Sequence, residues 1–211
     1  MLFPRIQSSC ARLVSQFDQI PDTRKAGLDQ IANYLHQHLV DTDQQLASII
    51  VICTHNSRRS HMGQLWLQIA AAYYGIKGLQ TYSGGTEATA FHPNAVKAMQ
   101  TLGVQIEVEQ FGANPVYACS WGPTSPAYLA FSKKFDVPSN PTNGFLALMV
   151  CTDADAACPF VSGAVARISL PFDDPKVADG TPHQSAKYLE RAEQIGRQCL
   201  YVLSKVNVPS R

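Results

Sequence analysis

The stretch Ala47-Ser48-Ile49-Ile50-Val51-Ile52-Cys53-Thr54-His55-Asn56-Ser57-Arg58-Arg59-Ser60 decides how this chain is expected to fold. Its first six residues form a short run rich in β-branched side chains, which is typical of a buried strand. A helix is predicted from about Ser60 to a stop at Gly75, and its apolar face carries Leu65, Trp66, Ile69 and Tyr73. The middle of the stretch is therefore a loop that joins the end of a strand to the start of a helix.

This loop has the pattern Cys-x5-Arg-Ser, with Cys53, Arg59 and Ser60 at its fixed positions. The N–H groups of a tight loop and of a helix N-terminus favour a reactive thiolate and form a concave site for a tetrahedral oxyanion. Arg59 can clamp two oxyanion oxygens, and Ser60 can hydrogen-bond the Cys53 sulfur and cap the helix. Asn56 suits a position with positive φ. The expected oxyanion-binding residues are Thr54, His55, Asn56, Ser57, Arg58, Arg59 and Ser60. The alternative is a buried cysteine beside an exposed arginine pair.

Predicted strands and helices alternate in the sequence that follows this loop. Further strands are predicted at residues 79–83, 145–150 and 165–170, and Val104, Ile106 and Val108 indicate another strand or an edge. Helices are predicted from Pro93 to Gly103 and from about residue 183 to 204. Such alternation indicates an α/β fold with a mostly parallel sheet.

Two segments lie outside this alternation. Residues 1–46 are predicted to be an N-terminal helical extension, because Leu28, Ile31 and Leu35 recur at helical spacing after a cap at Asp22 or Thr23. Residues 110–144 have little periodicity and are predicted to be an irregular insertion in a domain of residues 47–211. Its aromatic residues are expected to form their own small core, although they could wall a pocket or dock a partner: Tyr117, Trp121, Tyr128, Phe131 and Phe135.

The composition excludes several classes of protein. Of the 211 residues 45% are hydrophobic, 17 are Lys or Arg and 16 are Asp or Glu, which argues against disorder and against nonspecific binding of nucleic acid. No apolar run approaches the roughly 20 residues that span a bilayer, and the start does not resemble a signal peptide. We expect a cytoplasmic protein without a membrane partner, in which the six cysteines are thiols rather than a disulfide framework.

A second group of residues, outside this loop, supplies a candidate acid and two further thiols. Asp174 lies in the loop Phe172-Asp173-Asp174-Pro175 after a strand, where it can protonate a leaving group. Cys151 ends the strand at 145–150, and a loop over residues 152–157 leads to Cys158. These two thiols could pair if that loop folds back. Alternatively, they are one buried strand-end thiol and one unrelated loop thiol.

The remaining histidines and cysteines have simpler expectations. His55 and His61 lack neighbouring ligands, as does the Cys151–Cys158 segment, so we expect no metal and no cofactor. Both histidines are expected to be solvated or at the edge of the substrate. Of the other cysteines, Cys10 is expected in a mobile N-terminal segment and Cys119 in the insertion. Cys199 is expected on the core face of the last helix.

These motifs resemble the low-molecular-weight tyrosine phosphatase superfold and, more closely, its thioredoxin-coupled arsenate reductase branch. The resemblance is carried by residues 51–60, Tyr82-Ser83-Gly84-Gly85-Thr86-Glu87-Ala88, 93–99, 150–159 and 172–175. It covers about residues 47–108 and 145–205, and its specific part is the cysteine pair with its distance to Asp-Pro. The resemblance implies a three-layer fold with a four-stranded parallel sheet flanked by helices. The chain departs from compact members at Arg58, where such loops often carry a small residue or a second cysteine.

The resemblance implies a relay of thiols. Cys53 would attack arsenate held by the loop and Arg59, and Asp174 would protonate the departing oxygen. Cys151 would then attack Cys53 and release arsenite, and Cys158 would attack Cys151 to leave a disulfide that thioredoxin reduces.

Two other functions remain open. A protein tyrosine phosphatase that hydrolyses phosphoesters through a Cys53 phospho-enzyme needs only Cys53, Arg59 and Asp174, and phosphate is nearly isosteric with arsenate. Lys176 and Val177 follow Pro175 where such phosphatases often place aromatic residues, which favours the reductase. The third possibility is a noncatalytic binding module that uses the extension and the insertion, but the joint presence of all these reactive residues argues against it.

Overall fold

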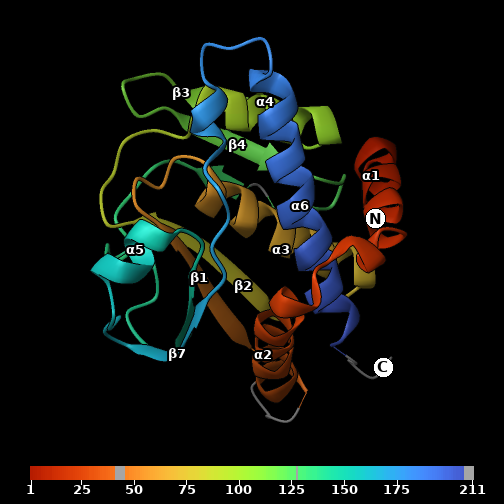
Figure 1. Cartoon of the computed structure of the whole chain (residues 1–211), viewed down its shortest axis with the longest axis vertical. Helices are drawn as coiled ribbons and strands as arrows, with labels where there is room; N and C mark the ends of the chain where they lie inside the picture. The colour runs from red at the N-terminus through yellow and green to blue at the C-terminus, as the bar shows by residue number, and fades with distance from the viewer. Residues whose placement is uncertain (41–45, 127, 207–211) are drawn as a thin grey trace.

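A computed structural model of the chain describes residues 1–40, 46–126 and 128–206 (Figure 1). Among these residues no helix is both long enough and apolar enough to cross a membrane. The helices are α1 (Pro4–Val14), α2 (Asp22–Leu39), α3 (Arg59–Tyr74), α4 (Pro93–Leu102), α5 (Thr152–Ala157) and α6 (Gln184–Ser204), with short 3-10 turns η1 (Phe17–Gln19) and η2 (Pro175–Ala178). The strands are β1 (Ala47–Cys53), β2 (Leu79–Gly85), β3 (Gln105–Gln110), β4 (Val116–Ser120), β5 (Tyr128–Ala130), β6 (Phe145–Met149) and β7 (Ala164–Ser169).

The main sheet has four parallel strands in the order β2-β1-β6-β7, which confirms the predicted α/β fold. The inner strand β1 is buried along nearly its whole length, as its continuous apolar run indicates. It runs in register with β2, so that Cys53 at its end lies beside Gly85. The carboxyl end of β1, where parallel α/β sheets place their ligands, therefore opens into the loop of residues 53–60.

Helices and the insertion cover the two faces of this sheet. On one face α3 packs closely against β1, since a side chain at Gly63 would lie only 3.0 Å from Val51. The long helix α6 packs on α3 in turn, with Gly196 pressed against the ring of Trp66. On the other face Phe135 lies directly over Gly84, where a Cβ would come within 2.3 Å of its backbone. The sheet is thus the middle layer of the molecule.

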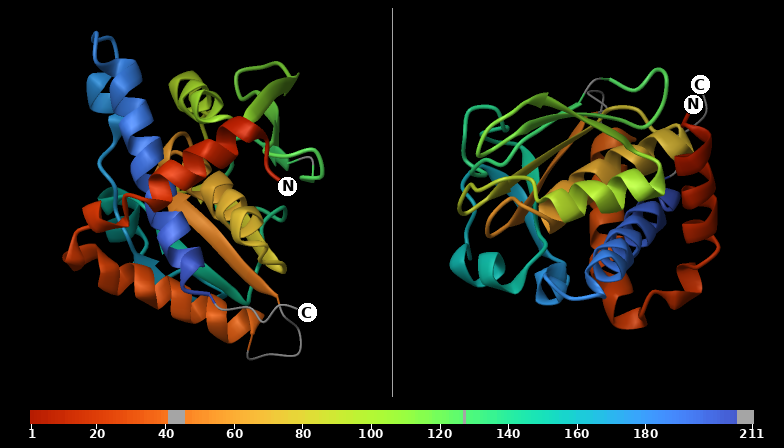
Figure 2. Two further views of the ribbon diagram at one scale, coloured as in Figure 1. Left: turned by 90° about the vertical axis from the view of Figure 1, so that its right-hand side faces the viewer. Right: turned by 90° about the horizontal axis from the view of Figure 1, so that it is seen from above.

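The first two helices wrap around α6 and complete the core (Figure 2). Ile6 and Leu13 of α1 and Leu28 of α2 are buried in the same hydrophobic cluster as the sheet. Cys10 on α1 is fully buried, so its expected place in a mobile segment is wrong. The predicted cap is wrong as well, because Pro21 is the N-cap of α2 and no side chain caps this end. Residues 41–45 of the predicted extension lie outside the described residues.

The insertion is irregular only in part, which corrects the prediction. Strands β3, β4 and β5 form a three-stranded antiparallel sheet, and the predicted strand of residues 104–108 belongs to this sheet rather than to the main one. A register shift between Val108 and Gln110 interrupts the alternation, and β5 has only three residues, so the pattern is weak in sequence. Tyr117 and Trp121 are buried in the main core, so a separate insertion core is also wrong. Residue 127 lies outside the described residues.

Candidate active site

The loop of residues 53–60, called the oxyanion loop below, is held in shape by Asn56. This residue has φ +43°, the positive value that the sequence predicts. Its side-chain amide donates to Ser60 Oγ at 2.9 Å, and its Oδ1 accepts from the backbone N–H of Lys133 at 2.8 Å. Gly85 at the end of β2 lies so close that a Cβ there would sit 2.5 Å from the carbonyl oxygen of Thr54. The loop is therefore fixed from both β2 and the insertion.

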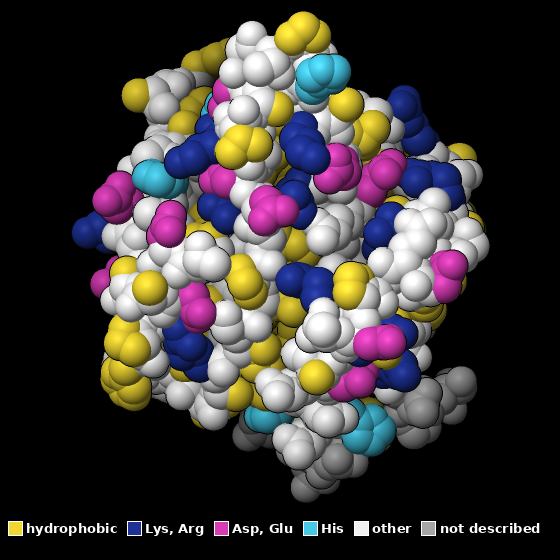
Figure 3. Space-filling model, in the orientation of Figure 1, with side chains coloured by type: hydrophobic (Ala, Val, Ile, Leu, Met, Phe, Trp, Pro, Cys, Tyr) yellow, Lys and Arg dark blue, Asp and Glu magenta, His cyan; other side chains and the backbone are white. Residues whose placement is uncertain are grey.

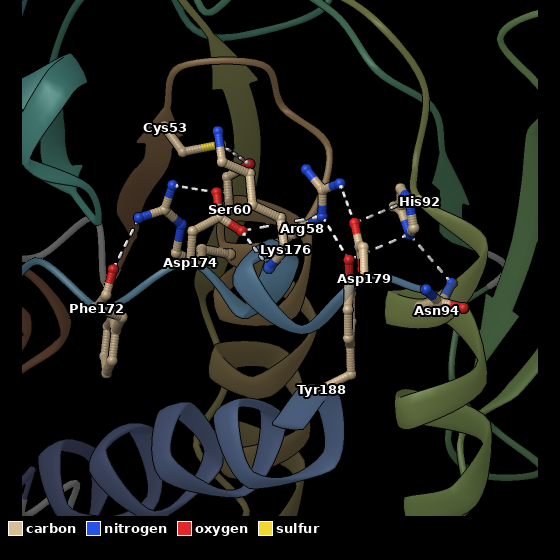
Figure 4. Close-up of polar contacts among 11 residues, drawn as sticks. Cys53, Arg58, Ser60, His92, Asn94, Phe172, Asp174, Lys176, Asp179 and Tyr188 are labelled. Atoms are coloured by element: carbon tan, nitrogen blue, oxygen red, sulfur yellow. Dashed lines mark hydrogen bonds and ion pairs between the residues drawn. The ribbon is translucent and has the colours of Figure 1, made fainter. Parts of the chain in front are cut away.

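The predicted nucleophile Cys53 lies at the bottom of this loop and is buried. Its Sγ is 3.0 Å from Ser60 Oγ, so the predicted hydrogen bond is present (Figure 4). Ser60 does not cap the helix, however, because α3 already begins at Arg59 and Arg58 is its N-cap residue. Since Ser60 also accepts from Asn56, its own proton is free to point at the sulfur.

Arg59 connects the oxyanion loop to the predicted acid. Its Nη2 donates to Asp174 Oδ2 at 2.7 Å, and its Nη1 donates to the carbonyl oxygen of Phe172 at 2.7 Å. Asp174 also accepts from the backbone N–H of Lys176 at 3.0 Å, as the N-cap of η2. We call residues 172–179 the acid loop. The structure thus brings Cys53, Arg59 and Asp174 together, with both ends of the guanidinium held by the acid loop.

Cys151 lies beside the oxyanion loop, whereas Cys158 does not. Cys151 is buried at the end of β6, and its Sγ is 3.4 Å from Thr54 Oγ1. The segment from Cys151 to Cys158 is the helix α5 and not the predicted loop, with the two cysteines as its N-cap and C-cap residues. This correction has a local cause: alanines favour a helix, and Asp153 and Asp155 stabilise its positive N-terminal end.

The histidines and the remaining cysteines differ in burial. His61 is 1% exposed and stacks on Phe91, so its expected position at a solvated or substrate edge is wrong. Burial, together with the charge of Lys133, lowers the pKa of His61 to about 3, so the ring is neutral. His55 is partly exposed beside Glu87. Within the described ranges no three His, Cys, Asp or Glu residues are placed to hold a metal. Burial raises the pKa of Cys10 and of Cys119 to about 12, and Cys199 is also buried.

Sequence reasoning missed the contacts of Arg58 and the burial of Lys133 at this site. Arg58 donates through Nε to the hydroxyl of Tyr188 at 2.7 Å and through Nη2 to Asp179 at 3.3 Å. Lys133 is only 8% exposed, and burial lowers its pKa to about 8. Both hydrogen bonds of Arg58 join residues more than 120 positions apart in the chain, so no local pattern indicates them. The only available signal was the unusual arginine at position 58.

One cavity borders the acid loop and a second borders the oxyanion loop. One of about 600 Å³ lies between α5, the acid loop and α6 and is lined by Arg59, Asp174 and Arg191 among others. The other, of about 480 Å³, lies beside the oxyanion loop and is lined in part by His55 and Arg58. On the face shown in Figure 3, basic and acidic side chains are interspersed. The larger cavity therefore borders Arg59 and the acid loop, and the smaller one borders the middle of the oxyanion loop.

Known proteins are similar to this chain in sequence and in fold. No protein-family model matches the chain. The arsenate reductase of Bacillus subtilis (strain 168) is 30% identical over 153 residues, which are 71% of this chain and 90% of that protein. An arsenate reductase in the phosphate binding state superposes with a TM-score of 0.51 at 13% identity, over 77% of this chain and 100% of the other. A low-molecular-weight phosphotyrosine phosphatase from Vibrio cholerae O395 gives a TM-score of 0.50 at 16% identity, over 75% of this chain and 94% of the other.

The two solved structures show a shared fold, and the identity to the bacterial reductase extends over most of both chains. The chain therefore belongs to the arsenate reductase family of enzymes, and it shares the fold of low-molecular-weight phosphatases.

Proposed function

We propose that this enzyme reduces arsenate, with Cys53 as nucleophile and with Cys151 and Cys158 as a relay that thioredoxin resets. The observation that carries the proposal is the position of Cys151, whose Sγ lies 3.4 Å from Thr54 Oγ1. A second thiol beside the oxyanion loop has no part in phosphoester hydrolysis, whereas a relay requires it. The similarity to a bacterial arsenate reductase supports the same function.

In the first step the Cys53 thiolate attacks the arsenic of an arsenate ion bound by the loop N–H groups and Arg59. An arsenate hydroxyl leaves as water with the proton of Asp174, and a sulfur–arsenic bond forms. Arg59 has to exchange its contact with Asp174 for the oxyanion in this step.

In the second step the Cys151 thiolate attacks Cys53 Sγ and forms a Cys53–Cys151 disulfide. The electron pair of the sulfur–arsenic bond passes to arsenic, which leaves as arsenite, reduced from As(V) to As(III). Cys158 then attacks Cys151, which frees the Cys53 thiolate and forms a Cys151–Cys158 disulfide. The dithiol of thioredoxin reduces this disulfide and is itself oxidised.

Phosphoester hydrolysis is a second candidate activity. The contacts among Cys53, Ser60, Arg59 and Asp174 form a complete set for a phospho-enzyme mechanism without the other cysteines. Because arsenate and phosphate have nearly the same shape, both activities can share this site.

A coupled assay tests the proposal and separates the two activities. NADPH oxidation is followed with arsenate, thioredoxin and thioredoxin reductase, and hydrolysis of p-nitrophenyl phosphate is measured beside it. We expect arsenate-dependent NADPH oxidation that requires thioredoxin. Hydrolysis of the ester without arsenate turnover would instead make the enzyme a phosphatase.

The variant Cys158→Ala sharpens this test. It should stop reduction after about one arsenite per enzyme, because the relay ends at the Cys53–Cys151 disulfide, and it should spare ester hydrolysis. Cys199→Ala, which removes a buried thiol of α6, is the matched control and should keep both activities. Normal thioredoxin-dependent turnover of Cys158→Ala would refute the relay.

A further inference from the structure

The Arg58 side chain lies where α6, the acid loop and the start of α4 meet the oxyanion loop. Arg58 is the residue before α3, and its side chain is only 14% exposed. Its Nε donates to the hydroxyl of Tyr188 on α6 at 2.7 Å, and its Nη2 donates to Asp179 Oδ2 at 3.3 Å (Figure 4). Asp179 directly follows η2 and ends the acid loop. Arg58 therefore joins the oxyanion loop to α6 and to the acid loop.

His92 at the start of α4 completes this group, which we call the Arg58 cluster (Arg58, His92, Asp179 and Tyr188). The His92 ring stacks on Tyr188 with its centroid 5.6 Å away, and its Nε2 is 4.0 Å from Asp179 Oδ2. Its Nδ1 accepts from the backbone N–H of Asn94 at 3.3 Å, so the proton of the neutral ring lies on Nε2 and faces Asp179. Burial and the charge of Arg58 lower the pKa of His92, which keeps the ring neutral.

The cluster holds the acid loop from the side opposite to Arg59. Asp174 and Asp179 stand at the two ends of η2, and Arg58 reaches both, at 3.9 Å from Asp174 Oδ1 and 3.3 Å from Asp179 Oδ2. Arg59 holds only the Asp174 end, through Asp174 Oδ2 and the carbonyl oxygen of Phe172. None of the Arg58 contacts involves Arg59, so they do not depend on where the Arg59 side chain points.

We propose that Arg58 is a positioning residue, which with His92, Asp179 and Tyr188 keeps the acid loop over Cys53 while Arg59 exchanges Asp174 for the oxyanion. The inference rests on the proposed role of Asp174 as proton donor. Arg58 itself contacts protein groups and not the reacting atoms.

The leaving group of an aryl phosphate reports the position of the acid. p-Nitrophenolate leaves readily without a proton, whereas phenolate needs one, so loss of a positioned acid affects phenyl phosphate most. Hydrolysis of both esters is measured for wild type, Arg58→Gln, Asp179→Asn and Asp174→Asn. Lys97→Gln removes an exposed cation of α4 outside the cluster and is the control with unchanged activity.

We expect Arg58→Gln and Asp179→Asn to lower kcat for phenyl phosphate about 30-fold and for p-nitrophenyl phosphate about 3-fold, part of the roughly 10²–10⁴-fold that a general acid supplies. KM should stay within about 2-fold for both esters, because loop N–H groups and Arg59 bind the phosphate. Asp174→Asn should show the largest difference between the esters. Arg58→Lys should restore only part of the loss, because an ammonium cannot reach Tyr188 and Asp179 as a planar guanidinium does.

The outcomes separate this inference from the proposed function. If Asp174→Asn loses both esters equally, Asp174 is not the acid and the proposed mechanism fails. If Asp174→Asn discriminates between the esters but Arg58→Gln and Asp179→Asn do not, the positioning role of Arg58 is refuted alone. Circular dichroism and the melting temperature establish folding, and Asp179→Asn provides the same readout should Arg58→Gln not fold.

Discussion

The oxyanion loop and the α5 segment carry the thiols of the proposed relay, yet they are held in different ways. Around Cys53 the groups are buried and hydrogen-bonded in series, from the backbone N–H of Lys133 through the Asn56 side chain to Ser60 Oγ and the sulfur. The α5 segment between Cys151 and Cys158 is a short helix in which only Ala154 is buried. The oxyanion loop is buried and held by these hydrogen bonds, whereas α5 is a surface segment with few core contacts.

The geometry of α5 requires it to move during the proposed relay. A helix rises about 1.5 Å per residue, so the Cα atoms of Cys151 and Cys158 lie about 10 Å apart. A disulfide needs Cα atoms within about 7 Å of each other. The last thiol exchange therefore requires α5 to unwind, and a short exposed helix has little free energy opposing this. In the proposed relay, oxyanion binding therefore needs a rigid loop, whereas disulfide transfer needs a segment that can unwind.

The largest expected effect is that of Cys53→Ser, which tests the preformed loop. This variant should lose arsenate reduction and ester hydrolysis by about 10⁴-fold or more, because both reactions begin at the thiolate. Phosphate should still raise the melting temperature, since the loop N–H groups and Arg59 remain in place. Cys199→Ser is the matched control. Turnover of Cys53→Ser within tenfold of wild type would rule out Cys53 as the nucleophile.

The strand and loop of residues 47–60 were predictable because the residues that determine them are close together in the sequence. β-branched residues before Cys53 and an apolar helix face after it determine both elements, and the loop between them follows. The positive φ of Asn56 and the contact of Cys53 with Ser60 also involve residues at most seven positions apart. Local chemistry was sufficient here.

Contacts that join distant segments were not predictable. Tyr188 lies 130 residues after Arg58, and no pattern near either residue indicates their hydrogen bond. The burial of Lys133 depends in the same way on how the insertion packs over β2. By contrast, α1 had a usable local signal, because Pro4 opens it and Ile6, Cys10 and Leu13 recur at helical spacing.

The mobility of α5 can be tested at Arg167 on β7. Its Nη2 donates to the backbone and side chain of Asp155, and its Nε donates to the carbonyl oxygen of Cys158 at 2.9 Å. These contacts stabilise the helical state, so Arg167→Met should speed the transfer of the disulfide to Cys158. Loss of about 1 kcal/mol from this partly exposed pair corresponds to about a 5-fold faster step.

Single-turnover reactions with arsenate, quenched by acid and mapped by mass spectrometry, measure this step. Arg12→Met removes a comparable ion pair, with Glu193, far from α5 and should leave the rate unchanged. A slower transfer in Arg167→Met would show that the contacts with Arg167 assist the relay. It would contradict the view that α5 has to unwind while the oxyanion loop stays rigid.

The smallest expected effect concerns Lys133, which lies behind the oxyanion loop without an acidic partner among the described residues. Its pKa is about 8 in the folded protein against 10.5 for a free lysine, so burial of its charge lowers stability below about pH 8. Between these two values the folded state releases the proton first, the unfolded state binds more protons, and stability rises with pH. Lys133→Met should therefore increase the free energy of unfolding by about 1–2 kcal/mol at pH 7 and by much less at about pH 10.

Urea denaturation at the two pH values measures this difference. The exposed neighbour Lys134 provides a matched control, and Lys134→Met should change stability little at either pH. An equal gain of Lys133→Met at both pH values would mean that the added apolar contact, rather than the removed charge, stabilises the variant. A loss at pH 7 would mean that the ammonium stabilises the backing of the loop, and the preformed region would then depend on a buried charge for its rigidity.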